Sequence, residues 1–412
     1  MRVEVPAPGA EPGASGQYGG VSRFGDGLAT GSDLRAAAQQ ATAAALSPLA
    51  GRTPDLVCAF VFAESPEDTE QALLHVAETT GATSVVGCSA GGVIGDGRGV
   101  EGGGGQGEGA VSVFAAILPG VRLRTFHLEV MRAEAGAAVI GLPARDGAEV
   151  ALLLADPYSF PADGFVAQVN TTLPGLALVG GLAAGPRGPG STRLVVDGRV
   201  VDRGAVGVLI EGAGATAIVS QGCRAVGPAM TVTSAKGNVL RELAGAPALE
   251  RVRQVLADLT PDEQALASTG LQVGIAMDEY AEDYDFLVRA VLGVDPDSGG
   301  LVVGDLVEVG QTVRLQVRDA ETADAALRSA LAAHRRDTRD APVGGALLFS
   351  CNGRGTSLFA GPYGGAHHDP AVVRTLLSGQ GVAGFFAGGE LGPVAGRNPL
   401  HGFTASLLAF PG

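Results

Sequence analysis

One stretch decides the predicted fold: Gly384-Phe385-Phe386-Ala387-Gly388-Gly389-Glu390-Leu391-Gly392-Pro393. An apolar run ends there in glycines, one carboxylate and a proline, and a second apolar run follows at 400–408. Small residues at the end of a strand allow a ligand or another backbone segment to approach closely. Glu390, Arg397, Asn398 and His401 should then lie on the loop between two strands, where binding groups usually sit.

The same plan occurs twice earlier in the chain. Residues 84–92 lead through a glycine-rich loop to the apolar run 110–115, and residues 178–185 lead to 204–210. Each copy is preceded by an apolar strand and an amphipathic helix, at 56–62 with 66–80, 150–154 with 162–173, and 346–349 with 370–377. An internal repeat fixes the architecture before any local motif. We therefore predict an α/β protein in two halves, with mixed sheets built from three β-α-β-loop-β repeats and a divergent stretch at 224–341.

Local signals refine this prediction. Ser65-Pro66 is a strong helix start, with a capping hydroxyl followed by proline at the first helical position. Asp197-Gly198 between β-branched residues predicts a hairpin with a type I′ turn. Ser32 should cap a helix at 32–46, and Asp369 should cap the helix that begins at Pro370.

Composition narrows the class of protein. The chain has 412 residues, of which 46% are hydrophobic and 17% charged, so it can bury a sizeable core. The formal net charge of −15 disfavours nucleic acid and anionic lipid as partners. No apolar run is long enough for a spanning helix, so no membrane insertion is expected. The N-terminus, 1–20, is predicted to be a disordered tail. Four widely spaced cysteines predict reduced thiols in a cytoplasm, with neither disulfides nor a metal site.

Several motifs together resemble those of FIST proteins. The run 349–355, Phe-Ser-Cys-Asn-Gly-Arg-Gly, and the runs 386–393 and 400–405 look like the C-terminal half of that family. The runs 86–92 and 221–224 look like its N-terminal half. The resemblance implies a FIST N-terminal domain at 21–235 and a FIST C-terminal domain at 236–412.

The resemblance also implies a function. The family is described as a small-ligand-binding sensory module of signal-transduction proteins, with amino acids or their derivatives as suggested ligands. This chain would then be a stand-alone bacterial type of sensor without a cofactor. Its signal would pass to a partner protein in trans or through a homo-oligomer.

The residue types on the loops fit a zwitterionic ligand. Arg354 can fork onto a ligand carboxylate, Asn352 can bond an amide or amine, and Glu390 can pair with an ammonium. The alternative is that Arg354 and Glu390 pair with each other and hold two loops together. The whole predicted ligand-binding set is Cys351, Asn352, Arg354, Glu390, Arg397, Asn398 and His401, with Cys88 and Ser89 from the first repeat.

Two other functions stay open. A thiol-dependent hydrolase or transferase would use Cys351 or Cys88 as nucleophile and His401 as base, although a small buried cysteine is the simpler interpretation. A protein-interaction scaffold would need no small ligand. His367-His368-Asp369 has metal-binding residue types, but adjacent side chains are expected to point apart, so no metal is expected there.

Overall fold

The computed structural model describes residues 2–3, 20–102, 108–133, 136–279, 286–378 and 381–412. It divides into two compact units. The main unit comprises Met1–Ser220, Leu327–Leu400 and Thr404–Gly412, and the inserted unit comprises Gln221–Ala326 and His401–Phe403. The predicted tail lies largely outside the described residues, but Arg2–Val3 form a short strand, β1, that pairs with β9 (Gly136–Ile140).

The three predicted repeats are confirmed. The first consists of β3 (Leu56–Phe62), α2 (Pro66–Thr80), β4 (Ser84–Ser89) and β7 (Gly109–Ile117). The second consists of β10 (Val150–Ala155), α3 (Ala162–Thr172), β11 (Ala177–Leu182) and β14 (Ala205–Glu211). The third consists of β23 (Val343–Cys351), α7 (His368–Leu377), β24 (Gly381–Ala387) and β27 (Thr404–Pro411). In every copy the first two strands are parallel, as a helical crossover requires, and the last strand is antiparallel to the first.

Each repeat forms the middle of one sheet. The first sheet has the order β13-β12-β4-β3-β7-β2, the second β1-β9-β8-β14-β10-β11-β25-β26, and the third β15-β27-β23-β24-β5-β6. The added strands are β2 (Arg23–Gly31), β5 (Gly92–Gly95), β6 (Arg98–Glu101), β8 (Arg122–Ala133), β12 (Leu194–Val196), β13 (Arg199–Val201), β15 (Thr216–Gln221), β25 (Glu390–Leu391) and β26 (Leu400–His401).

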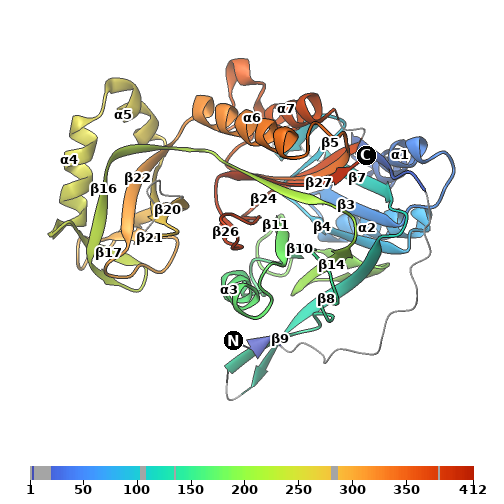
Figure 1. Cartoon of the computed structure of the whole chain (residues 1–412), viewed down its shortest axis with the longest axis horizontal. Helices are drawn as coiled ribbons and strands as arrows, with labels where there is room; N and C mark the ends of the chain where they lie inside the picture. Colours follow the sequence, from blue (N-terminus) through green and yellow to red (C-terminus); the bar gives the residue numbers. More distant parts are fainter. Residues whose placement is uncertain (1, 4–19, 103–107, 134–135, 280–285, 379–380) are drawn as a thin grey trace. The chain divides into compact units, whose positions relative to one another are not determined.

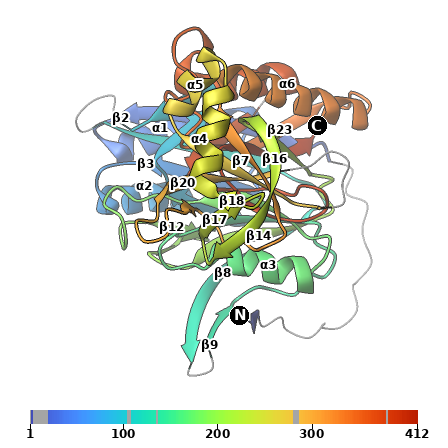
Figure 2. The same ribbon diagram turned by 90° about the vertical axis from the view of Figure 1, so that its left-hand side faces the viewer.

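The inner faces of the three sheets share one apolar core. Phe60 of β3, Phe349 of β23 and Phe385 of β24 meet at its centre, with ring centroids 5.1 to 6.2 Å apart. The helices α1 (Leu34–Leu46) and α2 pack on the outer face of the first sheet, α3 on the second, and α6 (Ala320–Asp337) with α7 on the third. Figures 1 and 2 show these helices on the outside of the strands. Strands covered on both faces explain why their sequences are apolar without alternation.

Two of the predicted caps are wrong. Asp33, and not Ser32, caps α1, because its side chain accepts the backbone N–H groups of Arg35 and Ala36. Asp369 lies inside the first turn of α7, which begins at His368, and its side chain is used elsewhere. The predicted cap Ser65 and the hairpin at Asp197-Gly198 are confirmed, the latter with positive φ at both residues.

The divergent stretch folds mainly as the inserted unit. Its strands are β16 (Cys223–Lys236), β17 (Val239–Leu243), β18 (Ala246–Pro247), β19 (Leu271–Ala276), β20 (Phe286–Val294), β21 (Leu301–Val303) and β22 (Thr312–Arg318). These hydrogen-bonded strands form a closed ring, because β16 pairs with both β22 and β17. The helix α4 (Ala248–Asp258) contributes Val252 and Val255 to the core that the ring encloses, and α5 (Pro261–Ser268) follows.

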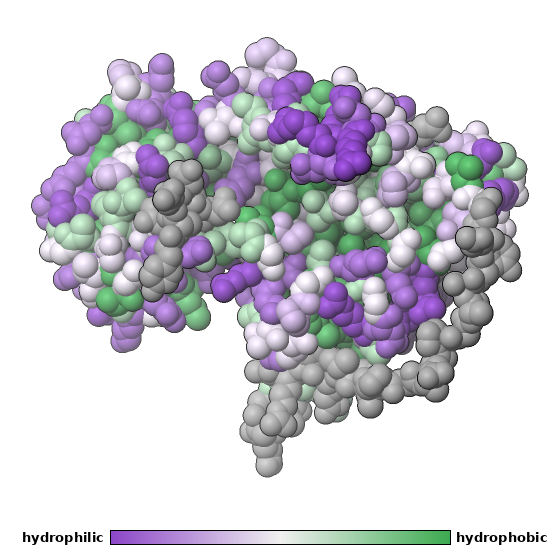
Figure 3. Space-filling model, in the orientation of Figure 1, coloured by the Kyte–Doolittle hydropathy of each residue, from purple (hydrophilic) through white to green (hydrophobic). Residues whose placement is uncertain are grey.

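The last turn of α6 is hydrophilic. Arg335 and Arg336 lie there, both exposed, and Figure 3 shows a cluster of hydrophilic side chains over this end of the helix. Positive side chains at a helix C-terminus also complement its dipole.

None of the helices in the described residues combines the length and apolarity that a bilayer crossing demands.

One glycine of the second repeat lends itself to a stability test. Gly180 in β11 has φ +140°, and an added Cβ would overlap the carbonyl oxygen of Leu153 on the neighbouring strand. We expect Gly180→Ala to lower the free energy of unfolding by about 1–3 kcal/mol, as overpacking in a core does. Gly31 at the end of β2 is the control, because its Cβ would meet nothing nearer than 4.0 Å. Equal urea midpoints for Gly180→Ala and Gly31→Ala would contradict the close approach of Gly180 to the Leu153 carbonyl.

Candidate functional site

The glycine-rich strand ends of all three repeats meet in the main unit. The backbone N–H of Ala184 donates to the Ser89 carbonyl at 3.1 Å, which joins the ends of β11 and β4. Leu182 exchanges backbone hydrogen bonds with Gly388 and Gly389, which joins the ends of β11 and β24. Asn352 lies at the same place, because its N–H donates to the Ala387 carbonyl at 2.9 Å. The predicted loops therefore converge around the end of β23.

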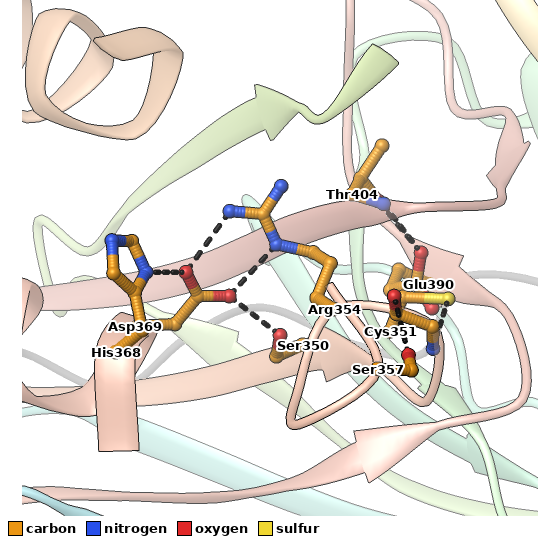
Figure 4. Close-up of polar contacts among 9 residues, drawn as sticks. Ser350, Cys351, Arg354, Ser357, His368, Asp369, Glu390 and Thr404 are labelled. Carbon is orange, nitrogen blue, oxygen red and sulfur yellow. Dashed lines mark hydrogen bonds and ion pairs between the residues drawn. The ribbon is translucent and has the colours of Figure 1, made fainter. Parts of the chain in front are cut away.

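The turn that follows β23 carries a buried cation. Arg354 has no exposed surface, and its guanidinium binds Asp369 of α7 through Nε to Oδ2 at 2.7 Å and Nη2 to Oδ1 at 3.0 Å. Ser350 and His368 complete the contacts of this carboxylate, at 2.7 and 2.9 Å (Figure 4). Burial alone would raise the pKa of Asp369, but the Arg354 charge and these hydrogen bonds hold it well below its usual range. Arg354 and Asp369 thus form a charged, buried pair.

An aromatic ring holds this pair in place. Phe359 has no exposed surface and stacks on the His368 imidazole, with ring centroids 3.6 Å apart. The guanidinium carbon of Arg354 lies 5.3 Å from the centre of the same ring, a distance typical of a cation–π contact. The turn at 351–359 is therefore fixed by packing as well as by charge.

Glu390 lies on the other side of Arg354, beside Cys351 (Figure 4). It has no exposed surface, and its Oε2 accepts the backbone N–H of Thr404 at 3.1 Å and the Thr404 hydroxyl at 2.8 Å. Burial raises the pKa of Glu390 to about 8, although the Thr404 hydrogen bonds, the Cys351 thiol and the Arg354 charge all lower it. The group is therefore mostly a neutral acid at pH 7 and ionises close to neutral pH.

Two buried polar atoms at this place have no hydrogen-bond partner within the described residues. They are Nη1 of Arg354 and Oε1 of Glu390, one a donor and one an acceptor. Buried polar groups in folded proteins are almost always bonded, so each such atom needs an explanation. The predicted direct pair between Arg354 and Glu390 is not the explanation, because Arg354 pairs with Asp369.

The side-chain amide of Asn398 makes hydrogen bonds to other parts of the main unit. Its Nδ2 donates to Asn170 Oδ1 and to the Leu176 carbonyl, and its Oδ1 accepts the Leu178 N–H at 2.8 Å. These bonds tie the loop after β24 to α3 and to the start of β11. A role of Asn398 in ligand binding stays a prediction, and the contacts seen are structural.

The remaining predicted residues are spread more widely. Asn352 is exposed, and its side-chain oxygen lies against Gly91, where an added Cβ would approach it to 3.1 Å. Arg397 is exposed at the tip of a turn closed by a backbone bridge to Val394. His401 is buried, and it groups with the inserted unit rather than the main unit.

The first-repeat residues lie inside the protein. Cys88 has no exposed surface, and burial raises the pKa of its thiol well above the ordinary value. A thiol of that kind is a poor nucleophile at neutral pH, which speaks against Cys88 in the enzymatic alternative. The Ser89 hydroxyl accepts the backbone N–H of Arg193 at 3.0 Å and so helps to hold the end of β4.

Two hollows in the described residues are lined by other side chains. One, of about 400 Å³, lies in the main unit beside His127, Arg193 and Arg203. The other, of about 540 Å³, lies in the inserted unit between α4 and the bulge in β16 at Gly227–Met230. No group of three or more metal-binding side chains occurs within the part of the chain that the structure describes.

Sequence reasoning missed several residues that build the site. Ser350, Phe359, His368 and Thr404 surround Arg354 and Glu390, and Asp369 was assigned to a helix cap. The available signal was chemical: a histidine and a carboxylate stand directly before a helical proline, in the same repeat as Arg354. Only the parallel pairing of β23 and β24 shows that α7 lies next to the turn after β23.

Comparison with known proteins assigns both parts of the chain to one family. Residues 55–246 match the FIST N domain and residues 248–393 match the FIST C domain. The two matches meet at 246–248, whereas the predicted boundary lies at 235–236. An uncharacterized protein of Mycobacterium tuberculosis is 44% identical over 395 residues, which cover 94% of this chain and 99% of the relative. One of Mycobacterium bovis is 41% identical over 394 residues, covering 94% and 98%.

Proposed function

We propose, from the premise that this chain belongs to the family that joins a FIST N domain to a FIST C domain, that it senses a small zwitterionic molecule, an amino acid or a derivative. FIST domains are regarded as sensory domains of signal transduction. The proposed site is the place where the three glycine-rich strand ends meet beside Arg354 and Glu390.

The observation that carries this proposal is the pair of unpartnered buried atoms. Nη1 of Arg354 and Oε1 of Glu390 offer one cationic donor and one acidic acceptor at a point surrounded by scaffold hydrogen bonds. A guanidinium N–H is a strong donor to a carboxylate, and a carboxylate is a strong acceptor for an ammonium. A ligand with both groups would satisfy both atoms.

Ligand binding would change the charge of Glu390. The acid is mostly protonated at pH 7, because burial raises its pKa to about 8. An ammonium group placed against it favours the charged form, so Glu390 would release its proton as the ligand binds. Binding of an amine-bearing ligand should therefore become tighter as the pH rises from 6 to 8.

The site is closed in this structure, since Arg354 and Glu390 have no exposed surface. Entry of a ligand requires the strand ends to separate. The hydrogen bonds of Leu182 with Gly388 and Gly389 are the bonds that would open, and they connect the second repeat with the third. Such a movement would carry the signal to a partner protein or to a second copy of the chain.

A thermal-shift screen tests the proposed function. Amino acids and related metabolites are added to the reduced, full-length protein, and the unfolding temperature is recorded. A ligand at about 100 times its dissociation constant should stabilise the fold by about 2.7 kcal/mol. The same ligand should stabilise Glu390→Gln much less, because the neutral amide cannot pair with an ammonium.

The control is Glu78→Gln, which changes an exposed carboxylate on α2 by the same chemistry. It should respond to the ligand as the unmodified protein does. Two results would refute the proposal: no shift with any amine-bearing carboxylate, or an equal shift in Glu390→Gln and Glu78→Gln.

A further inference from the structure

Cys351 differs from the other cysteines of the main unit in its surroundings. It is the last residue of β23, and its Sγ accepts the backbone N–H of Gly353 at 3.4 Å. About 8% of the residue is exposed, whereas Cys58 and Cys88 have no exposed surface. Burial raises the pKa of the Cys58 and Cys88 thiols, which keeps them in the unreactive thiol form.

Charged and acidic groups surround the Cys351 sulfur. The Glu390 carboxyl group lies beside it, and the interaction of the two side chains is one of those that lower the pKa of Glu390 (Figure 4). Burial lowers the pKa of Arg354, and the charges that raise it again are Asp369, Cys351 and Glu390. Arg354 is thus a cation that interacts electrostatically with Cys351. A backbone donor and a nearby cation are the features that activate a cysteine.

We propose that Cys351 is a peroxide-sensing thiol that is oxidised to a sulfenic acid, with Glu390 as the group that passes the proton. The small exposed area of Cys351 favours a reagent as small as hydrogen peroxide over a bulky electrophile. This proposal goes beyond the proposed function and does not rest on the binding of an amino acid.

The reaction balances without a further reagent. The Cys351 thiolate attacks one oxygen of hydrogen peroxide, the O–O bond breaks, and the sulfur loses two electrons to become S–OH. The leaving hydroxide takes the proton from the Glu390 acid and departs as water, which leaves Glu390 as a carboxylate. The proton lost when the thiolate forms goes to the solvent, so in sum one thiol, one peroxide and the Glu390 acid give one sulfenic acid, one water, the Glu390 carboxylate and one released proton.

The product would use the atom that is unpartnered before oxidation. Oε1 of Glu390 accepts no hydrogen bond within the described residues, and a sulfenic O–H beside it is a suitable donor. The groups that face Glu390 are Cys351, Arg354 and Thr404, and Arg354 connects it to Asp369 and His368. Oxidation would therefore alter the charge balance at the junction of the three repeats.

Trapping of the sulfenic acid tests the proposal. The reduced full-length protein is treated with hydrogen peroxide at pH 6 to 9 and is then unfolded in the presence of dimedone, so that the trap reaches every sulfenic acid, and the labelled peptides are quantified by mass spectrometry. We expect Cys351 to be labelled at least about tenfold faster than the partly exposed Cys223, because an activated thiol reacts first. Cys351→Ser should remove this label, and Cys223→Ser should leave it unchanged.

The dependence on pH identifies the proton partner. Cys351 and Glu390 together must lose one proton before Cys351 can react, and the pKa of Glu390 is about 8. The labelling rate should therefore rise with pH and level off above about 8. Glu390→Gln should slow labelling at pH 7 by about a hundredfold, at the low end of what a positioned proton-transfer group contributes. Equal rates at Cys351 and Cys223, or a pH profile that Glu390→Gln leaves in place, would overturn the proposal. An amino-acid screen without any thermal shift would leave this result untouched, so the two proposals fail separately.

Discussion

Replacement of Asp369 by asparagine is expected to lower the free energy of unfolding by about 3–5 kcal/mol. Arg354 is fully buried and keeps its charge, since its pKa is raised above an already high value. Asparagine would leave that charge unpaired, and its NH₂ group would face a guanidinium that has only donors. A change of this size is a large part of the stability of an ordinary domain. Urea unfolding followed by circular dichroism measures it.

The matched control is Asp202→Asn. Asp202 also pairs with an arginine, Arg203, at 3.0 Å, but both side chains are at least half exposed. Its loss should cost less than about 1 kcal/mol, as for other surface ion pairs. Asp369→Asn with a urea midpoint as high as that of Asp202→Asn would show that the buried pair is not intact in solution.

A double variant separates the cost of an unpaired charge from the value of the pair. Arg354→Met combined with Asp369→Leu removes both charges and keeps apolar volume. Apolar replacements of whole buried ion pairs are often neutral or stabilising. We therefore expect the double variant to be more stable than Asp369→Asn, and the opposite order would mean that Ser350 and His368 depend on the carboxylate.

The repeat could be predicted because its signals are local. Each copy has an apolar strand, an amphipathic helix and a glycine-rich strand end within a short window, as in 56–62 and 66–80, and the structure places β3 and α2 at those bounds. Periodicity and helix-start chemistry depend on neighbouring residues, so one sequence is enough to show them. The hairpin at Asp197-Gly198 follows from the same kind of local rule.

The site could be predicted only in part, because its contacts are distant in sequence. Asp369 precedes a helical proline, and the local rule assigns such a carboxylate to a cap. Its contacts with Ser350 and Arg354 depend on the pairing of β23 with β24, which sets where α7 begins relative to the turn. Asn398 shows the same limit, since its partner Asn170 belongs to another repeat. The sequence shows which polar residues are present, but it does not show which residues they bind in the folded protein.

The dependence of stability on pH is the second large effect. The pKa of Glu390 is raised from 4.5 to about 8 in the folded protein, so between these values the folded state holds a proton that the unfolded state has lost. The free energy of unfolding should therefore fall as the pH rises from about 4.5 to 8, by about 4–5 kcal/mol from this group alone, and then level off. Glu390→Gln keeps the volume but does not titrate, so it should remove this part of the profile.

Asp369 gives the opposite slope in another window. Its pKa is lowered from 3.8, so its contribution to stability is present above that value and is lost as the pH falls below it. Urea unfolding of the two proteins from pH 4 to 9 separates the effects, because only the slope between 4.5 and 8 should differ. Glu390→Gln should be the more stable protein above pH 8. At that pH the unmodified chain must either bury an ionised carboxylate or keep Glu390 protonated although the solution favours its ionised form. Parallel profiles for both proteins would mean that Glu390 is solvated or paired in solution, and that the closed junction of the three repeats is not the state that the folded protein adopts.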